Sequence, residues 1–128
     1  MAGQRDEMIP RKELKRHLRR TDWPGIVYLT SHLMAIGVSG YLVFFAMGSA
    51  WLVPAMILHG LNMSCLFSPL HECCHGTAFR TRWLNEAVLH FCGLACIHPG
   101  LYFRYTHAAH HTHTQIRGKD SELILPGP

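Results

Sequence analysis

Two apolar stretches specify a membrane hairpin, IVYLTSHLMAIGVSGYLVFFA at residues 26–46 and LVPAMILHGLNMSCLFSPL at residues 52–70. Each has close to the roughly 20 residues that an α-helix needs to cross the apolar core of a bilayer. Both lie within residues 23–71, where no Asp, Glu, Lys or Arg occurs. A soluble domain of 128 residues has too little interior to bury so long an uncharged run. The sequence therefore predicts an integral membrane protein with two spanning helices.

The flanking residues support this hairpin and predict its orientation. Trp23 and Trp51 precede the two stretches, at positions that suit the interfacial belts of a membrane protein. Residues 47–50 form a short turn, and Pro54 lies in the first turn of the second helix, where a missing N–H costs little. Seven of the twelve Lys and Arg residues lie within residues 1–22. Because positive charge marks the cytoplasmic side, we expect a basic cytosolic N-terminal segment at 1–22 and both ends of the hairpin in the cytoplasm.

The segment at residues 84–102 is less apolar than the two predicted spans. Its polar residues are Asn85, Glu86, His90 and His98. Pro99 and Gly100 interrupt it, and we expect an interfacial or partly embedded helix that does not cross the membrane. A crossing at this point would place the histidines before it and after it on opposite faces of the bilayer. Earlier in the chain, we expect Pro69 to kink or tighten the end of the second span.

The eleven histidines include two groups with helical spacing. His71 and His75 are four residues apart, so on a helix both side chains lie on one face. The second group has histidines at i, i+3 and i+4, again on one helical face, and the predicted topology brings both groups to the same side of the membrane. Imidazole is a ligand for iron, zinc, copper and nickel. We therefore predict that one metal site takes its ligands from His71, His75, His107, His110 and His111.

We expect other roles for three further histidines. His32 and His59 lie within the predicted spans, where polar groups must find partners. Packing or a helix–helix hydrogen bond is favoured there over metal binding. His113 comes two residues after His111 and therefore points elsewhere on a helix.

The first histidine group also matches the pattern H-E-x-x-H. In zinc metalloproteases this pattern supplies two zinc ligands, and its glutamate acts as the general base. Glu72 would be that base here. The pattern is short, it leaves the second histidine group unexplained, and no carboxylate follows as an obvious third ligand. A membrane zinc protease is therefore kept as an alternative.

Both groups resemble the histidine boxes of the membrane fatty acid desaturases. The first box is similar to HECCHGTAFRTRWLN at residues 71–85, and the second, HxxHH, to FRYTHAAHHTHT at residues 103–114. The continuation QIRGKDSEL at residues 115–123 also resembles the stretch that follows the second box in bacterial members. The close resemblance covers residues 70–125. Either box alone is a weak signal, but both in order behind an apolar hairpin are a strong one.

The resemblance implies a fold and a metal site. The fold is all-α, a helical hairpin with cytosolic histidine-box helices that forms half of a four-transmembrane-helix desaturase, and residues 23–128 are part of that domain. The metal site is a di-iron centre on the cytosolic face. By match to the boxes, all five histidines of the two groups are iron ligands, and Glu72 orients a ligand imidazole rather than acting as a base.

The resemblance also implies an oxidoreductase reaction. Such enzymes use O2 and two electrons to introduce a double bond into an acyl chain, presented as an acyl lipid, acyl-CoA or an acyl carrier. The methylene C–H bond has no acidity that side-chain acid–base chemistry could use, so a metal cofactor is needed. The external electron donor is of the ferredoxin or cytochrome b5 type. Nucleic acid is not an expected partner, because no base-reading module follows the basic N-terminal segment.

The sequence departs from the family in one respect, which leaves alternatives open. The family has a third box, HxxHH or QxxHH, and the five histidines of the first two boxes are fewer than two irons need. We therefore expect these residues to be the N-terminal part of a desaturase and to be inactive alone. A di-iron membrane hydroxylase or ketolase also uses histidine boxes, although the run at residues 76–82 favours the desaturase. A membrane fragment without enzymatic activity is the remaining alternative.

Overall fold

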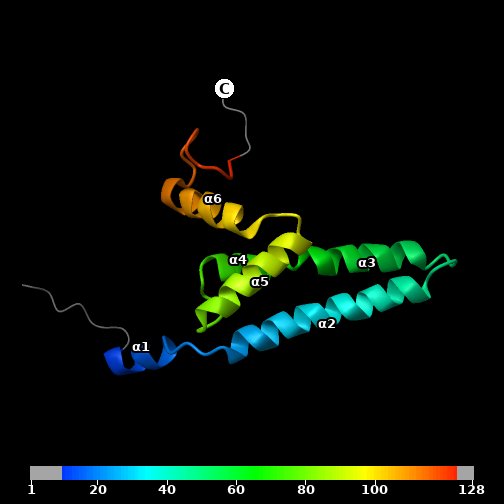
Figure 1. The fold of residues 1–128 in the computed structure, drawn as a ribbon, viewed down its shortest axis with the longest axis horizontal. Coiled ribbons are helices and arrows are strands. Elements are labelled where there is room, and N and C mark those ends of the chain that lie inside the picture. The colour runs from blue at the N-terminus through cyan, green and yellow to red at the C-terminus, as the bar shows by residue number, and fades with distance from the viewer. Residues whose placement is uncertain (1–9, 124–128) are drawn as a thin grey trace, which may run out of the picture.

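A computed structural model describes residues 10–123, which form six α-helices and no strand (Figure 1). The helices are α1 (Arg11–His17), α2 (Trp23–Phe45), α3 (Leu52–Ser64), α4 (Phe67–Cys74), α5 (Arg82–Ala95) and α6 (Gly100–His113). Helices α2 and α3 form a long antiparallel hairpin, while α4, α5 and α6 gather at its far end, near the start of α2 (Figure 1). The all-helical fold class is confirmed.

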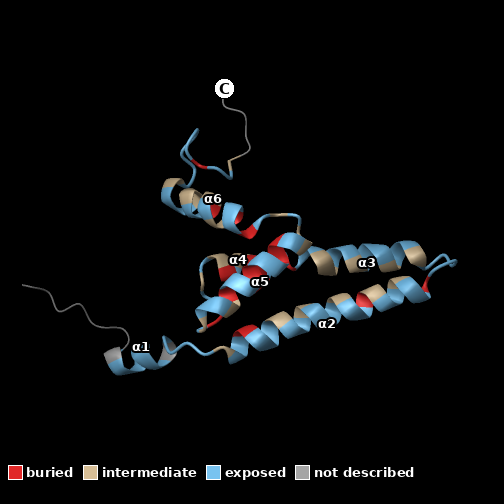
Figure 2. Ribbon diagram, viewed as in Figure 1, coloured by how far each residue is buried: buried red, intermediate tan, exposed pale blue. Residues whose placement is uncertain are grey.

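The predicted hairpin is confirmed, but its helices differ in bounds from the predicted spans: α2 begins before residue 26, and the second span is divided between α3 and α4. Helix α2 begins at Trp23 and α3 at Leu52, with a turn over residues 46–51 between them. Within the described part of the chain, Trp23–Phe45 and Leu52–Cys74 are long and apolar enough to cross a membrane. Only 6% and 11% of their apolar windows are buried inside the molecule, and the outer faces are exposed along their length (Figure 2). Such surfaces need an apolar environment, which a bilayer provides.

The two histidines of the hairpin make local and interhelical contacts. His59 Nδ1 and Ser39 Oγ hydrogen-bond at 3.0 Å across α2 and α3, and Ser39 is only 1% exposed. His32 Nδ1 contacts the Tyr28 carbonyl oxygen at 2.9 Å, one helical turn back along α2. Hydrogen bonds between helices, such as that of His59 with Ser39, help to hold transmembrane helices together, because lipid tails are as apolar as the side chains and apolar contact alone gives little preference for another helix. The predicted helix–helix hydrogen bond is therefore found at His59, whereas His32 bonds within its own helix.

Pro69 accounts for the interruption between α3 and α4. Proline has no N–H, so the carbonyl oxygen of Cys65 lacks its normal helical donor four residues later. The N–H of Ser68 donates to that oxygen instead, over 3.1 Å, and the helix tightens for one turn. The regular pattern resumes when the Leu70 N–H donates to the Leu66 oxygen. The predicted distortion therefore lies one turn before the proline.

Residues 84–102 form parts of two helices rather than one. Helix α5 has 14 residues, too few to cross a bilayer, and it folds back along α4 (Figure 1). Helix α6 begins at Gly100, immediately after Pro99, where the sequence predicted a break. The helices α4, α5 and α6 enclose a small apolar core of Leu66, Leu70, Cys73, Phe79, Val88, Leu89, Cys92 and Phe103.

The residues just before α2 hold the loop that follows α4. Asp22 accepts hydrogen bonds from the Thr81 N–H at 2.8 Å and the Thr81 hydroxyl at 2.6 Å, which lowers the pKa of the Asp22 carboxyl. Arg20 donates to the backbone carbonyls of Gly76 and Phe79. These contacts fix the loop at the membrane-entry end of α2.

Candidate metal centre

His71 and His75 come from the end of the second apolar stretch. They are one turn apart, at the last turn and C-cap of α4, and their ring centroids are 4.8 Å apart. Between them Cys73 points into the core and is fully buried. Because a helix that buries one face presents its other side chains outward, this packing leaves both imidazoles free to meet another element.

His107 and His111 occupy the corresponding positions on α6. Their ring centroids lie 4.5 Å apart, and the His107 ring stacks on Phe103 at 5.0 Å. His107 is 7% exposed, although imidazole is a polar group, whereas His111 is exposed. A buried imidazole is stable only if its ring nitrogens have partners. The contacts of the two nitrogens of His107 therefore show what this site can bind.

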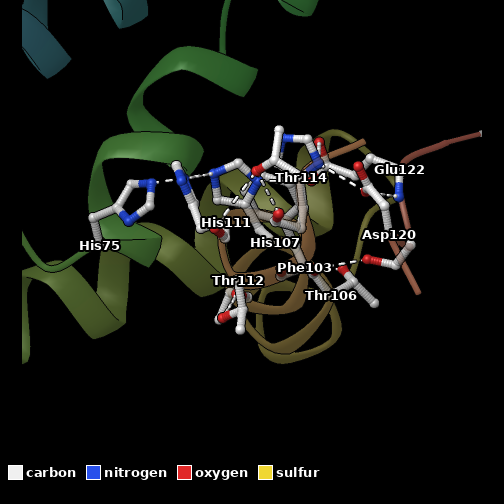
Figure 3. Close-up of polar contacts among 12 residues, drawn as sticks. His75, Phe103, Thr106, His107, His111, Thr112, Thr114, Asp120 and Glu122 are labelled. Atoms are coloured by element: carbon white, nitrogen blue, oxygen red, sulfur yellow. Dashed lines mark hydrogen bonds and ion pairs between the residues drawn. The ribbon is translucent and has the colours of Figure 1, made fainter. Parts of the chain in front are cut away.

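The histidines of the two helices converge on one point. Ligand nitrogens of His71, His75, His107 and His111 all lie within 4.8 Å of one another. His107 Nε2 lies 3.1 Å from His75 Nε2 and 3.0 Å from His111 Nε2 (Figure 3). A neutral imidazole carries only one N–H, so nitrogens that face one another so closely compete for few protons. A metal cation at the centre would satisfy all of their lone pairs.

The electrostatics of His75 favour a metal over a proton. Partial burial, together with the neighbouring His71, His107 and His111, lowers the pKa of His75. Burial disfavours the charged ring, and the surrounding imidazoles add like-charge repulsion whenever they are protonated. The lowered pKa favours the neutral form of His75, which is the form that coordinates a metal.

Glu122 fixes the orientation of His107 from the side away from the cluster. Its Oε1 lies 2.6 Å from His107 Nδ1 (Figure 3). A carboxylate accepts hydrogen bonds, so Nδ1 carries the proton and Nε2 presents its lone pair to the other histidines. Metal-ligating histidines have this arrangement, in which a carboxylate holds the ring and raises its basicity.

His110 lies outside the four-histidine group, although the sequence predicted it as a fifth ligand. Its Nδ1 is 2.8 Å from Asp120 Oδ1, and this contact raises the pKa of His110. The same hydrogen bond lowers the pKa of Asp120 to about 2. Positions 110 and 111 are about 100° apart around a helix, so the two rings face in different directions. His110 faces the segment after α6, where Asp120 is buried.

Asp120 and Glu122 contact histidines of the candidate site, and the sequence analysis did not predict either contact. Asp120 Oδ2 also accepts the Gln115 N–H at 2.8 Å, and Oδ1 accepts the Glu122 N–H at 3.0 Å. The segment after α6 therefore folds back over that helix and carries Glu122 to His107. The available signal was the pair of carboxylates in the stretch that resembles the family after its second box.

Glu72 makes a weaker contact than Glu122. Its Oε1 is 3.5 Å from His71 Nδ1, longer than an ordinary hydrogen bond, and Thr77 Oγ1 donates to its Oε2 at 3.1 Å. The carboxylate is about half exposed. Glu72 is thus placed near a candidate ligand, but its position is held mainly by the Thr77 hydroxyl.

The sequence comparisons identify the family. Residues 49–127 match the model of the family described as Fatty acid desaturase. The chain belongs to the fatty acid desaturase family. The matched residues include the whole four-histidine group, Asp120 and Glu122. No solved structure matches the chain.

Curated desaturases resemble the chain over part of their length. A bifunctional fatty acid conjugase/Delta(12)-oleate desaturase of Punica granatum is 35% identical over 54% of this chain and 17% of its own. An sn-1 oleoyl-lipid 12-desaturase of Synechocystis is 30% identical over 69% of this chain and 24% of its own. The protein of the same name from Anabaena variabilis is 29% identical over 86% and 30%. The chain thus spans less than a third of the length of each of these relatives.

Replacing Glu122 with glutamine is expected to weaken metal binding by this chain about 10- to 100-fold. The amide is neutral and no longer raises the basicity of His107. The visible absorption of Co(II), titrated into the purified chain in detergent, measures the affinity. The matched control is Glu72→Gln, which we expect to change the affinity by less than about threefold, because its contact with His71 is long and exposed. A loss of metal affinity of more than about threefold in Glu72→Gln would contradict the expectation that Glu122 contributes more to metal binding than Glu72.

Proposed function

We propose that this protein is a fatty acyl desaturase with a di-iron centre, whose ligands include His71, His75, His107 and His111. The observation that carries the proposal is the convergence of four imidazoles from two histidine boxes within 4.8 Å. Imidazole nitrogens are suitable ligands for iron. Asp120 engages only Nδ1 of His110, so we keep His110 in the proposed ligand set through its Nε2.

The proposed reaction explains why the site needs a metal. A methylene group of an acyl chain has no acidic proton, and iron with O2 supplies the oxidising power to remove its hydrogens. The protein holds the ligands rigid: Glu122 fixes the tautomer of His107, and the Phe103 ring packs against it. Helices α2 and α3 bring this site to the surface of a bilayer, where an acyl chain already resides.

The proposed topology follows from the basic N-terminal segment at residues 1–22. We propose that it lies in the cytoplasm and that residues 23–128 belong to the membrane domain, with the histidines on the cytoplasmic face. Electrons then come from a cytosolic donor of the ferredoxin or cytochrome b5 type. The substrate is an acyl lipid, an acyl-CoA or an acyl carrier. We infer that these 128 residues alone bind metal without turning over substrate, because five imidazoles are too few for two irons.

Lipid analysis of a host that expresses the full gene tests the proposal. Gas chromatography with mass spectrometry of fatty acid methyl esters should show a new double bond and no oxygenated product. The triple variant H107A/H110A/H111A should remove that product. A hydroxylated or keto product would instead indicate the hydroxylase class. Zinc-dependent peptide cleavage that is lost in Glu72→Gln would indicate a protease, and an unchanged lipid profile would contradict the assignment.

A further inference from the structure

A cavity rich in arginine adjoins the metal centre. It has a volume of about 420 Å³, and its lining includes Arg20, Arg80, Arg82, Arg104, Glu86 and His75. A second cavity, of about 370 Å³, is lined by His75, His107 and His111 and shares Cys74, His75 and Arg104 with the first. These three shared residues are therefore all that lies between the arginine-rich cavity and the cavity lined by the histidines.

Positive charge in this cavity is only partly compensated. Glu86 is the one acidic residue in the lining, and it takes a two-pronged ion pair with Arg104, at 2.9 and 3.0 Å. Arg20 donates to backbone carbonyls, which carry no formal charge. Within residues 10–123, the Arg80 and Arg82 side chains have no hydrogen-bond or ion-pair partner, and both residues are exposed. Arg80 also acts electrostatically on Asp22 and Arg82 on Glu86, but neither carboxylate pairs directly with these arginine side chains, so the cavity keeps a net positive charge for an anion.

The backbone at the start of α5 adds to the positive electrostatic potential of the cavity. Helix α5 begins at Arg82, with Thr81 as its N-cap, and neither a side-chain cap nor an acidic residue occupies its first turn. The Thr81 hydroxyl donates to Asp22 instead. The exposed N–H groups and the helix dipole give this end of α5 a partial positive charge, at the same place as Arg82.

The cavity lies beside the start of the first candidate spanning helix, which places it at the expected level of the lipid headgroups. Asp22 is the residue immediately before the first spanning helix, and it holds Thr81, which lies between Arg80 and Arg82. Arg20 is two residues earlier, and Trp23, at the first position of α2, is exposed. The hydrogen bonds that fix the loop at the membrane-entry end of α2 therefore also fix the cavity next to the bilayer surface.

We propose that this cavity is a phosphate-binding site for the headgroup of the acyl substrate. The proposal rests on the function proposed above and narrows its substrate to an acyl chain carried on a phosphate-bearing headgroup. Arginine binds phosphate oxygens through paired N–H donors. Several guanidinium groups around one concave site can bind a single phosphate together. The carboxylates on the surface of a partner protein are spread too widely to fit such a site as well. A headgroup held here keeps the acyl chain beside the histidine group.

Binding of short-chain lipids to the purified chain tests the proposal without any turnover. The chain is held in dodecyl maltoside, and calorimetry compares dihexanoylphosphatidic acid, dihexanoylglycerol and inorganic phosphate. We expect one phosphatidic acid to bind per chain, far more tightly than either other compound. The variant Arg80→Gln/Arg82→Gln should lose affinity by about tenfold or more, because two charged hydrogen-bond donors are removed.

A second double variant separates the cavity from general charge. Lys12→Gln/Arg16→Gln removes two exposed positive charges of α1 outside the cavity, and we expect less than about threefold loss from it at physiological salt. Circular dichroism verifies that both variants keep their helices. Equal losses in the two double variants, or equal affinity for inorganic phosphate and phosphatidic acid, would overturn the proposal.

Three further outcomes show whether the cavity or the proposed function is wrong. If Arg80→Gln/Arg82→Gln loses binding to an acidic ferredoxin but keeps the lipid, the cavity serves a protein and the proposal is wrong. If the full protein desaturates fatty acids while the cavity variant binds phosphatidic acid normally, the headgroup site fails and the proposed function stands. Specific lipid binding by a protein that forms no double bond would support the cavity and reject only the desaturation.

Discussion

Replacing His107 with alanine is expected to lower the affinity for Fe(II) by more than about 100-fold, beyond the cost of losing a residue that only orients a ligand. His107 is central to the group, because its Nε2 lies within 3.1 Å of His75 Nε2 and 3.0 Å of His111 Nε2. Its loss also releases the carboxylate of Glu122 from the site. Iron content by mass spectrometry and Fe(II) titration of the purified chain measure the effect.

Two controls separate the loss of a ligand from general damage to the fold. His113→Ala changes the same helix, but His113 Nδ1 contacts the Ala109 carbonyl oxygen and the residue is not in the four-histidine group. We expect that variant to keep its iron. Free imidazole should restore part of the binding to His107→Ala, because it can occupy the vacated space. Iron retained by His107→Ala would show that the group is not the metal site.

Replacing Gly100 with valine is expected to displace α6 and to destabilise the fold by about 1–3 kcal/mol. A Cβ at this position would lie 2.7 Å from Leu89 Cγ and 2.9 Å from the Leu89 carbonyl oxygen. The carbonyl belongs to the backbone of α5 and cannot move aside, so α6 must shift instead. Because α6 carries His107 and α4 carries His75, the shift separates their nitrogens. Thermal unfolding in detergent and Co(II) absorption should both report the change.

The matched control is a glycine whose added side chain would meet nothing. Gly60, in the middle of α3, has no atom within 4 Å of an added Cβ. Gly60→Ala should leave metal binding intact and raise helix stability by about 0.5–1 kcal/mol, through the better helix propensity of alanine. If Gly100→Val melted at the same temperature as the unaltered chain and bound Co(II) equally well, the close packing of α5 and α6 would be refuted.

The elements near the membrane could be predicted because their signals are local. An uncharged run of spanning length is sufficient to define a membrane helix, and the start at Leu52 agrees with the prediction, whereas α2 begins at Trp23 and not at residue 26. The division of residues 84–102 between two helices was harder to predict from the sequence. A proline announces a break, but where α5 ends and how α6 returns along it depend on contacts such as that of Gly100 with Leu89.

The candidate site shows the same division. Helical spacing predicted that His71 would pair with His75 and His107 with His111, since residues four apart share a helix face. The spacing predicted His110 as a ligand just as it did His107 and His111. Only the folded chain shows that the His110 side chain faces Asp120. The contribution of Glu122 depends on the backbone turn after α6, which Asp120 holds by accepting two N–H groups.

By itself, the sequence determined that the chain is helical, that two of its stretches suit a bilayer and that its histidines are grouped for a metal. Hydropathy and helical periodicity arise between near neighbours, so they can be read along the chain. Only the tertiary structure decided which four imidazoles meet, which carboxylate orients His107 and that four arginines surround one cavity beside them. Those arrangements depend on distances between residues far apart in sequence, which the packing of α4, α5 and α6 sets.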